Sequence, residues 1–290
     1  MSTPPFLTLP PCARAVRLKT ARGDFATLEA RPSGAVRATA LLVPGFTGSK
    51  EDFIALLAPL SAAGFRTVAV DLRGQYETGG PADEGAYALS ELGLDLLSLT
   101  DAVAEGGAPH LLGHSFGGYV VREAVLAAGE PTRWSSLTLL STGPAAIDPQ
   151  EAKRTSLLLD ALTMLDLEGI WQVMQQLEEG SGDQATPPPP EVGEFLHRRW
   201  VSNVPQSLTV MGRQLLCEPD RVAELAAVEL PKLVLSGERD YAWPIRWQSA
   251  MAERLGARRV VISDSGHSPN VERPAETAAA LLDFWSGSMP

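Results

Sequence analysis

The sequence predicts an α/β protein with a mostly parallel central sheet, helices on both faces, and a helical insertion between two late strands. Short apolar runs alternate with longer segments of helical periodicity along most of the chain. Parallel strands need such helical crossovers, so this alternation is typical of a parallel sheet. From about residue 147 to 226 the alternation stops, and helical patches follow one another without a convincing strand.

The first half of the chain supplies a hairpin and the first parallel strands. Residues 15–31 alternate imperfectly and are expected to form a hairpin, which Pro32 closes. Residues 38–44 form an apolar run that is too short for a helix and ends in Pro-Gly, so a buried strand is expected there. The next expected elements are a helix at 51–63, a strand at 66–70, a helix at 89–105 and a strand at 110–113.

The second half continues the alternation around the insertion. Outside it, the expected elements are a helix at 119–128, strands at 136–140, 232–235 and 259–262, and a helix at 275–285. Inside it, helical patches are expected at 152–165, 170–177, 192–200 and 206–216. Residues 180–190 are rich in glycine, serine and proline. The four prolines at 187–190 do not suit a helix interior, so this stretch is expected to form an exposed hinge.

Bulk composition places the chain among globular proteins and excludes two kinds of partner. Its 290 residues suffice for one large domain or two modest ones, with 44% hydrophobic and 20% charged residues. The formal net charge of −11 argues against a nucleic-acid partner and against docking on anionic lipid, because both need a basic face. Cys12 and Cys217 can form one bridge at most, and their spacing indicates neither a metal site nor a redox pair.

The N-terminal segment does not resemble a secretory signal. It lacks a basic start, an apolar core and a small-residue cleavage site, although a chain from which a signal had been removed would look the same. No apolar stretch approaches the roughly 20 residues that span a bilayer. We therefore expect a cytoplasmic protein without a membrane partner.

Residues 113–117 read GHSFG and match the G-x-S-x-G pattern around a nucleophilic serine. The motif follows a short apolar strand, and a helix opens after it, as a tight strand-to-helix turn requires. The glycines are needed because this turn forces backbones together and leaves no room for a Cβ atom. Ser115 is therefore the predicted nucleophile, and the plain alternative is a glycine turn that carries a solvated serine.

Together with four other segments, this motif makes the chain resemble the α/β-hydrolase superfamily, in particular its lidded esterases and lipases, over nearly its whole length. In the family's order the segments are VPGF at 43–46, DLRG at 71–74, GHSFGG at 113–118, GERD at 237–240 and SGH at 265–267. The resemblance implies a core of residues 1–146 and 227–290. It also implies a helical lid of residues 147–226, before the acid-bearing strand. The chain departs from the family at Tyr76 and Thr78, where relatives often have glycine and serine, which implies a different pocket wall.

The chemistry requires a base for the serine. A serine hydroxyl is a poor nucleophile unless a base lies within hydrogen-bond reach, and histidine can both accept and return a proton near neutral pH. His114 adjoins the serine but should point away from the reacting face. His110 begins the same strand, and His197 lies in the insertion. His267 follows a strand and lies in a loop, so it is the candidate base by position and by elimination.

The third member of the triad is an acid that orients the imidazole and stabilises the imidazolium. Asp240 directly follows a strand at its carboxyl end, where ligand sites in such sheets cluster. Its plain alternative role is to cap the next turn. Asp148 is the competitor, because some relatives carry the acid on the strand before the lid. Asp264 lies too near His267 along the same strand exit.

An oxyanion needs amide donors that are fixed in advance, each contributing roughly 3–4 kcal/mol to the transition state. We assign this role to the backbone N–H groups of Phe116, just after the nucleophile, and Phe46, in the turn after the strand at 38–44. Plain core packing is the alternative for Phe46, although Pro44 and Gly45 before it would then have no obvious purpose.

These residues predict a serine hydrolase that cleaves a small to medium, largely uncharged carboxylic ester through an acyl-enzyme, without a cofactor or a metal. No arginine or lysine is expected to face the serine, which favours a small-molecule substrate with an apolar acyl or alkyl group. Candidate substrate-binding residues are Trp171, Met174 and Trp200 in the insertion and Trp243 after the acid. The plain alternative for each is packing of the insertion on the core.

Several other activities remain open. The same triad supports thioesterase, amidase, carbon–carbon bond hydrolase and cofactor-free haloperoxidase chemistry, and the fold does not choose among them. A different class is a non-catalytic relative that binds a ligand as a receptor does, which the complete Ser/Asp/His set disfavours. No H-E-x-x-H motif, Cys/His cluster or G-x-G-x-x-G spacing indicates a metal or a dinucleotide.

Overall fold

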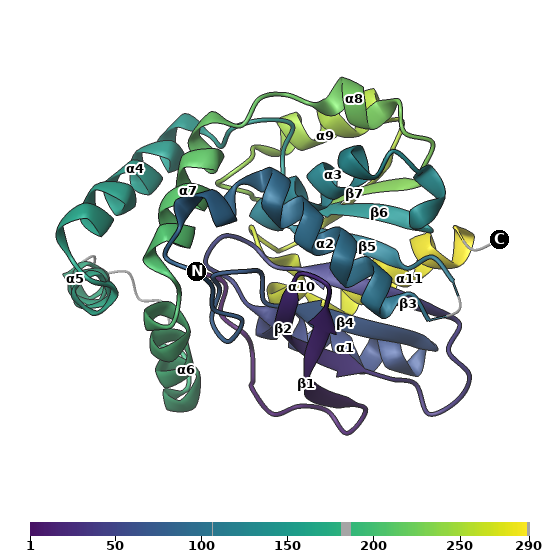
Figure 1. Cartoon of the computed structure of the whole chain (residues 1–290), viewed down its shortest axis with the longest axis horizontal. Coiled ribbons are helices and arrows are strands. Elements are labelled where there is room, and N and C mark those ends of the chain that lie inside the picture. The colour runs from purple at the N-terminus through teal and green to yellow at the C-terminus, as the bar shows by residue number, and fades with distance from the viewer. Residues whose placement is uncertain (106, 181–186, 289–290) are drawn as a thin grey trace.

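The computed structural model describes residues 1–290 except 106, 181–186 and 289–290. Within these residues the centre is an eight-stranded sheet in the order β1-β2-β4-β3-β5-β6-β7-β8 (Figure 1). The strands are β1 (Ala13–Thr20), β2 (Gly23–Ala30), β3 (Ala38–Val43), β4 (Phe65–Val70), β5 (His110–His114), β6 (Ser136–Leu140), β7 (Lys232–Gly237) and β8 (Arg258–Ile262). β2 pairs antiparallel with both β1 and β4, and all pairs from β4 to β8 are parallel. The predicted mostly parallel sheet is confirmed.

Helices cover both faces of the sheet and fill the insertion. They are α1 (Ile54–Ala62), α2 (Leu89–Val103), α3 (Phe116–Ala128), α4 (Pro149–Met164), α5 (Leu167–Gly180), α6 (Pro190–Val201), α7 (Pro205–Cys217), α8 (Val222–Ala226), α9 (Ile245–Leu255), α10 (Pro269–Glu272) and α11 (Pro274–Gly287), with 3₁₀ turns η1 (Lys50–Phe53), η2 (Glu84–Tyr87) and η3 (Pro131–Arg133). Helix α9 was not expected from the sequence, although its buried residues Gln248, Met251, Ala252 and Leu255 follow helical spacing.

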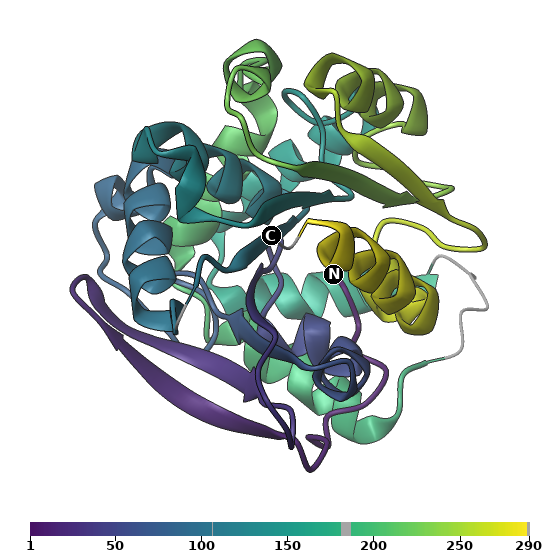
Figure 2. The ribbon, with the colours of Figure 1, turned by 90° about the vertical axis from the view of Figure 1, so that its right-hand side faces the viewer.

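The core has two halves, one on each face of the sheet. Successive side chains of a strand point to opposite faces, so Leu41 and Val43 of β3 pack with α2 and α3. Ala40 and Leu42 of the same strand pack with α1 and α11 on the other face. Figure 2 shows this layering, with α11 in yellow on one side of the sheet and the blue to teal α2 and α3 on the other. These strands are buried on both faces, which explains their continuous apolar runs.

Helices α4 to α8 lie between β6 and β7, and α4 to α7 stand together at one end of the sheet (Figure 1). Leu167 and Ile170 of α5 pack with Trp200 of α6 and Leu208 of α7 in a small cluster of their own. Helix α8 packs elsewhere, beside α9 of the core. Of the expected hinge at 180–190, residues 181–186 lie outside the described residues, and Pro190 begins α6 as its first helical residue.

Among the described residues no helix has both the length and the apolar character needed to cross a membrane. Cys12 is half-buried and Cys217 is exposed, and both are free thiols.

Candidate active site

Ser115 occupies the turn that the G-x-S-x-G motif predicts, between the end of β5 and the start of α3. Its backbone has φ 55° and ψ −122°, a combination that a non-glycine residue adopts only at a cost. Neighbouring structure holds this conformation, because the Ser115 N–H donates to the Leu140 carbonyl at 2.9 Å and the Ser115 carbonyl accepts from Gly118 at 2.8 Å. A strained turn of this kind presents the side chain of Ser115 at the edge of the sheet.

Glycines surround the turn because other backbone segments approach it closely. A Cβ atom on Gly117 would lie 2.5 Å from the Pro44 carbonyl oxygen, and one on Gly113 would overlap the backbone of Gly117. A Cβ atom on Gly45 would lie 3.0 Å from the Cβ of Ser115. The loop after β3 therefore lies directly against the serine, as the predicted oxyanion loop must.

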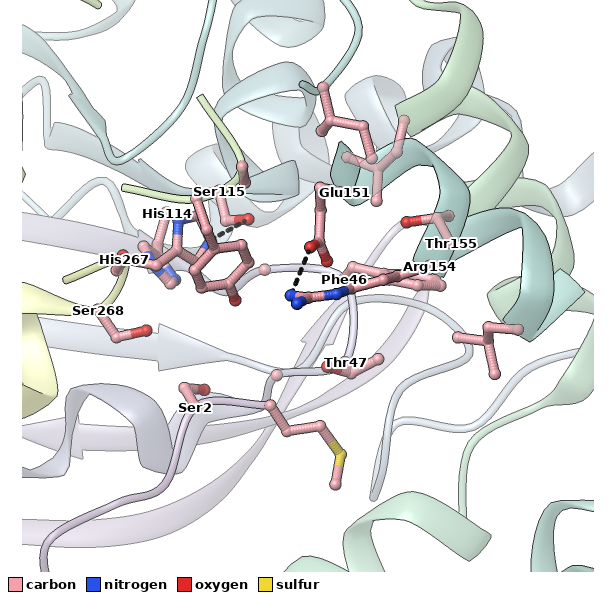
Figure 3. Close-up of a pocket in the computed structure, with 18 of the residues that line it drawn as sticks. Ser2, Phe46, Thr47, His114, Ser115, Glu151, Arg154, Thr155, His267 and Ser268 are labelled. Atoms are coloured by element: carbon pink, nitrogen blue, oxygen red, sulfur yellow. Dashed lines mark hydrogen bonds and ion pairs between the residues drawn. The ribbon is translucent and has the colours of Figure 1, made fainter. Parts of the chain in front are cut away.

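His267 and Asp240 reach Ser115 from the ends of two neighbouring strands. The Nε2 atom of His267 lies 2.9 Å from the Ser115 Oγ (Figure 3). Its Nδ1 atom lies 2.9 Å from the Oδ1 of Asp240. A carboxylate only accepts hydrogen bonds, so Nδ1 carries the proton of the neutral ring and Nε2 is free to accept the serine proton. The structure thus brings together the three residues that the sequence singled out as nucleophile, base and acid.

The carboxylate of Asp240 is fully buried and has four hydrogen-bond donors. Its Oδ1 accepts from the N–H groups of Ala242 and Trp243 as well as from His267, and its Oδ2 accepts from the Gln248 side chain at 2.8 Å. Burial alone would raise the pKa of Asp240, but the charge and hydrogen bond of His267 and the two backbone donors lower it below the usual value. Asp240 therefore stays ionised at neutral pH.

Two residues hold the loop that carries His267. Glu272 was not singled out from the sequence, and His114 was expected to point away from the reacting face but lines the cavity beside His267. The carboxylate of Glu272 accepts from the N–H groups of Gly266 at 2.5 Å and Ser268 at 2.9 Å, on either side of the histidine. His114 Nε2 lies 2.9 Å from the His267 carbonyl oxygen, which can only accept a hydrogen bond, so the single ring proton of neutral His114 is on Nε2. Burial, reinforced by the nearby His267, lowers the pKa of His114 to about 4, so its ring is neutral at pH 7.

The other histidines and aspartates considered as base or acid make hydrogen bonds or ion pairs elsewhere in the structure. His110 bonds to the Ser136 hydroxyl at 2.8 Å, and His197 pairs with Glu168 at 2.7 Å on the insertion. Asp148 caps α4 by accepting from the Gln150 N–H. Asp264 pairs with Arg273. None of these side chains bonds to Ser115 or His267.

The two predicted oxyanion donors flank the serine on the oxyanion loop and on α3. Within the described residues, no protein acceptor is found for the N–H groups of Phe46 and Phe116, and Phe46 lines the cavity described below. Sequence reasoning missed the residue that fixes the first of these donors. Gln75 is fully buried, and its Nε2 donates to the carbonyls of Gly45 at 2.7 Å and Phe46 at 3.1 Å, while its Oε1 accepts from the Leu72 N–H.

A cavity of about 240 Å³ opens over Ser115 and His267. Met174 of α5, Trp200 of α6 and Trp243 line it, as do Phe46 and apolar residues of α4 and α7. Trp171 does not line the cavity. Instead it packs between the helices of the insertion and against the His197 ring, with centroids 5.2 Å apart.

The cavity wall also carries a charged pair that the sequence did not indicate. Glu151 and Arg154 of α4 both line the cavity, and their side chains lie 3.3 Å apart (Figure 3). From the sequence, only apolar residues of the insertion were expected in the cavity, whereas α4 also places these two polar residues in its wall, with Arg154 largely exposed. The described residues contain no group of three or more histidine, cysteine or acidic side chains that could hold a metal ion.

Known proteins are similar to this chain both in sequence and in fold. A profile described as "Alpha/beta hydrolase family" matches residues 40–280. The "Putative carbamate hydrolase RutD" of Variovorax paradoxus (strain S110) is 28% identical over 250 residues, which is 84% of this chain and 90% of that protein.

Two solved structures are similar over nearly their whole length. A hydrolase from Pseudomonas aeruginosa PA01 has a TM-score of 0.72 at 26% identity, covering 93% of this chain and 98% of the other. A thermophilic esterase from Thermogutta terrifontis has a TM-score of 0.73 at 24% identity, covering 96% of this chain and 100% of the other, a likeness of fold. The sheet, the serine turn and the profile match over most of the chain together establish that this protein belongs to the alpha/beta hydrolase family.

Proposed function

We propose that this hydrolase cleaves small carboxylic esters through an acyl-enzyme formed on Ser115. The observation that carries the proposal is the chain of two 2.9 Å hydrogen bonds from the Ser115 Oγ through His267 to Asp240, at the cavity wall. Similarity in fold to esterases supports the same reading.

The first half of the reaction forms the acyl-enzyme. His267 Nε2 takes the proton of Ser115 as Oγ bonds to the ester carbonyl carbon, and the buried Asp240 carboxylate stabilises the resulting imidazolium. The N–H groups of Phe46 and Phe116 stabilise the oxyanion. As the tetrahedral intermediate collapses, the bond to the alcohol oxygen breaks, and that oxygen takes the proton from His267.

The second half releases the acid. A water molecule gives a proton to His267 and attacks the acyl carbon, and the second tetrahedral intermediate forms against the same two N–H groups. Collapse breaks the bond to Ser115 Oγ, which recovers its proton from His267. The products are a carboxylic acid and an alcohol, and the protein returns to its starting protonation state.

The cavity favours a small substrate. Its volume of about 240 Å³ lies below the roughly 300–1,000 Å³ of pockets that enclose drug-sized ligands. Residues 147–226 are proposed as the lid of the cavity, because α4, α5, α6 and α7 each contribute lining side chains. Met174 and Trp200 supply apolar surface for an acyl group, while Glu151 and Arg154 place polar groups on the same wall.

Shortening Met174 to alanine is expected to shift acyl preference toward longer chains. Each methylene is worth about 1–3 kcal/mol in an apolar pocket, so the shift should be graded. The kcat/KM values of p-nitrophenyl esters of rising chain length measure it. Trp171→Ala is the matched control, since Trp171 lies on the same helix but does not line the cavity. The Trp171→Ala variant should have a lower melting temperature and the same acyl-chain preference as wild type. The same unchanged profile in Met174→Ala would rule out Met174 as a pocket residue.

Replacing Gln75 with leucine is expected to lower kcat by about 10²-fold with little change in KM. The loop that carries the Phe46 N–H would lose both of its bonds to Gln75, and a misplacement of about 1 Å near the reacting atoms costs that much. KM should stay nearly unchanged, because the Phe46 N–H stabilises an oxyanion that forms in the transition state and is not present in the bound substrate. Gln214→Leu is the control, because Gln214 also donates to a backbone carbonyl, but to that of Tyr87 and not to the oxyanion loop. If kcat in both variants stayed within threefold of wild type, Gln75 would have no positioning role.

A carbamate is the second candidate substrate, because the RutD relative is named for that activity. A carbamate presents a carbonyl carbon to the same nucleophile and adds a nitrogen that the Glu151–Arg154 pair could contact. The deciding experiment is a panel that contains p-nitrophenyl esters, acyl-thioesters and carbamates of matched size. Ester hydrolysis with the largest kcat/KM supports the proposal. A carbamate or thioester that exceeds every ester by tenfold would replace the proposed bond specificity.

A further inference from the structure

The first residues of the chain lie in the wall of the active-site cavity. Met1 and Ser2 line it together with Thr47 of the oxyanion loop and Ser268, which follows the base. Figure 3 shows Ser2 beside Ser268 and Thr47, on the opposite side of the cavity from Glu151. Ser2 is half-buried, whereas Thr3 is exposed and does not line the cavity.

Ser2 is held in place by a side chain from the insertion. Arg199 of α6 donates from Nη2 to the Ser2 carbonyl at 2.7 Å and from Nη1 to the Oδ1 of Asp52 at 2.8 Å. The side chains of Arg199 and Asp52 are both completely buried. An arginine carries its donors in a fixed fork, so the one guanidinium sets the position of Ser2 relative to Asp52.

Asp52 connects this anchor to both parts of the reacting site. Its Oδ2 accepts from the N–H of Ser49, at the end of the oxyanion loop, at 3.4 Å. Its carbonyl accepts from the side chain of Asn270 at 2.8 Å, three residues after the base. The N-terminal residues, α6, the oxyanion loop and the His267 segment therefore meet at a single buried ion pair.

The N-terminal segment continues along α6 away from the cavity. Leu7 packs against the cluster of Val192, Phe195 and Leu196 on that helix, and Pro4 is buried between the two contacts. The segment thus has an apolar anchor at Leu7 and a hydrogen-bonded anchor at Ser2. Two anchors fix the direction in which residues 1 and 2 enter the cavity.

We propose that Ser2, positioned by Arg199, forms the wall that limits the size of the alcohol half of the substrate. The inference rests on the proposed esterase function. The leaving alcohol takes its proton from His267 and must lie next to that ring, and Ser2 lies beside Ser268 on the same side of the cavity. The substrate class is then an ester of a small alcohol, and the N-terminal segment is a specificity-determining element.

The test compares two series of esters, one of acetates with growing alcohols from methyl to benzyl, and one of methyl esters with growing acyl chains. Ser2→Phe should lower the ratio of kcat/KM for benzyl acetate to that for methyl acetate at least tenfold, because the ring occupies the space of the larger alcohol. Thr3→Phe is the control and should keep the wild-type ratio. The acyl series should keep its profile in both variants.

Arg199→Lys is expected to change the benzyl-to-methyl ratio of kcat/KM in the opposite direction. Lysine keeps the charge beside Asp52 but lacks the fork that reaches both partners, so Ser2 is released and the benzyl-to-methyl ratio should rise several-fold. Arg198→Lys, at an exposed neighbour, is its control and should leave the ratio unchanged. If Ser2→Phe did not fold, Arg199→Lys would decide alone, because a merely structural arginine lowers the melting temperature without changing the ratio.

Failure of this inference differs from failure of the proposed function. If wild-type protein hydrolyses both acetates and the ratio is the same in wild type and both variants, Ser2 does not limit the alcohol. A change confined to the acyl series would also overturn the assignment. If wild-type protein hydrolyses no ester of either series and its Ser115 does not react with a fluorophosphonate, the proposed function itself is wrong.

Discussion

Replacement of Ser115 by alanine is expected to reduce kcat by on the order of 10⁶-fold while the melting temperature stays nearly unchanged. The loss is large because nucleophile and base act as a unit, and the base has nothing to deprotonate once the hydroxyl is gone. Stability should hold because the Ser115 side chain makes one hydrogen bond, to His267, and alanine keeps the backbone bonds to Leu140 and Gly118. Hydrolysis of a p-nitrophenyl ester and thermal unfolding measure the two quantities.

Ser141→Ala is the matched control. Ser141 is also buried, has a φ of 47° and follows a strand of the same sheet, but it does not line the cavity. Its variant should retain wild-type turnover. A Ser115→Ala variant that kept a tenth of wild-type activity would exclude Ser115 as the nucleophile.

Replacement of Asp240 by asparagine is expected to lower kcat by roughly 10⁴-fold. The amide cannot stabilise an imidazolium as a carboxylate does, and its N–H₂ group favours the ring tautomer with the proton on Nε2, the wrong nitrogen for a base. Asparagine has nearly the same shape as aspartate. With its N–H₂ group toward His267, its oxygen still accepts from Gln248, while the N–H groups of Ala242 and Trp243 lose their acceptor. Steady-state kinetics at neutral pH, where Asp240 is ionised, give the comparison.

Asp148→Asn separates the two acids that the sequence left in competition. Asp148 caps α4, and asparagine caps a helix about as well as aspartate, so turnover and stability should both change little. The reverse ranking of the two variants would place the functional acid on the loop after β6.

The positions of the reacting residues could be predicted because short motifs impose local geometry. The glycines around Ser115 leave room for backbone segments that approach it closely, and the ends of neighbouring parallel strands bring Asp240 and His267 to the same edge. Each of these inferences needs only the residues next to the motif and the order of the strands. The mostly parallel sheet followed from the alternation of elements for the same reason.

The supporting contacts could not be predicted because they join residues far apart in the sequence. Gln75 meets the oxyanion loop 30 residues away, and Arg199 meets Asp52 across 147 residues. No local pattern records such pairs. The sequence also did not show which side of each inserted helix faces the cavity. Trp171 and Met174 were therefore both predicted to line it, although only Met174 does.

The assignment of Ser115 as the nucleophile is tested most directly by the site and stoichiometry of reaction with a fluorophosphonate. The mass of the intact protein, the peptide that carries the adduct and the remaining ester hydrolysis are followed together over time. We expect one adduct per chain, on Ser115, with activity lost in proportion to labelling and no labelling in Ser115→Ala. Ester hydrolysis that continues undiminished after Ser115 is fully modified, or an inactivating adduct on another residue, would contradict the assignment.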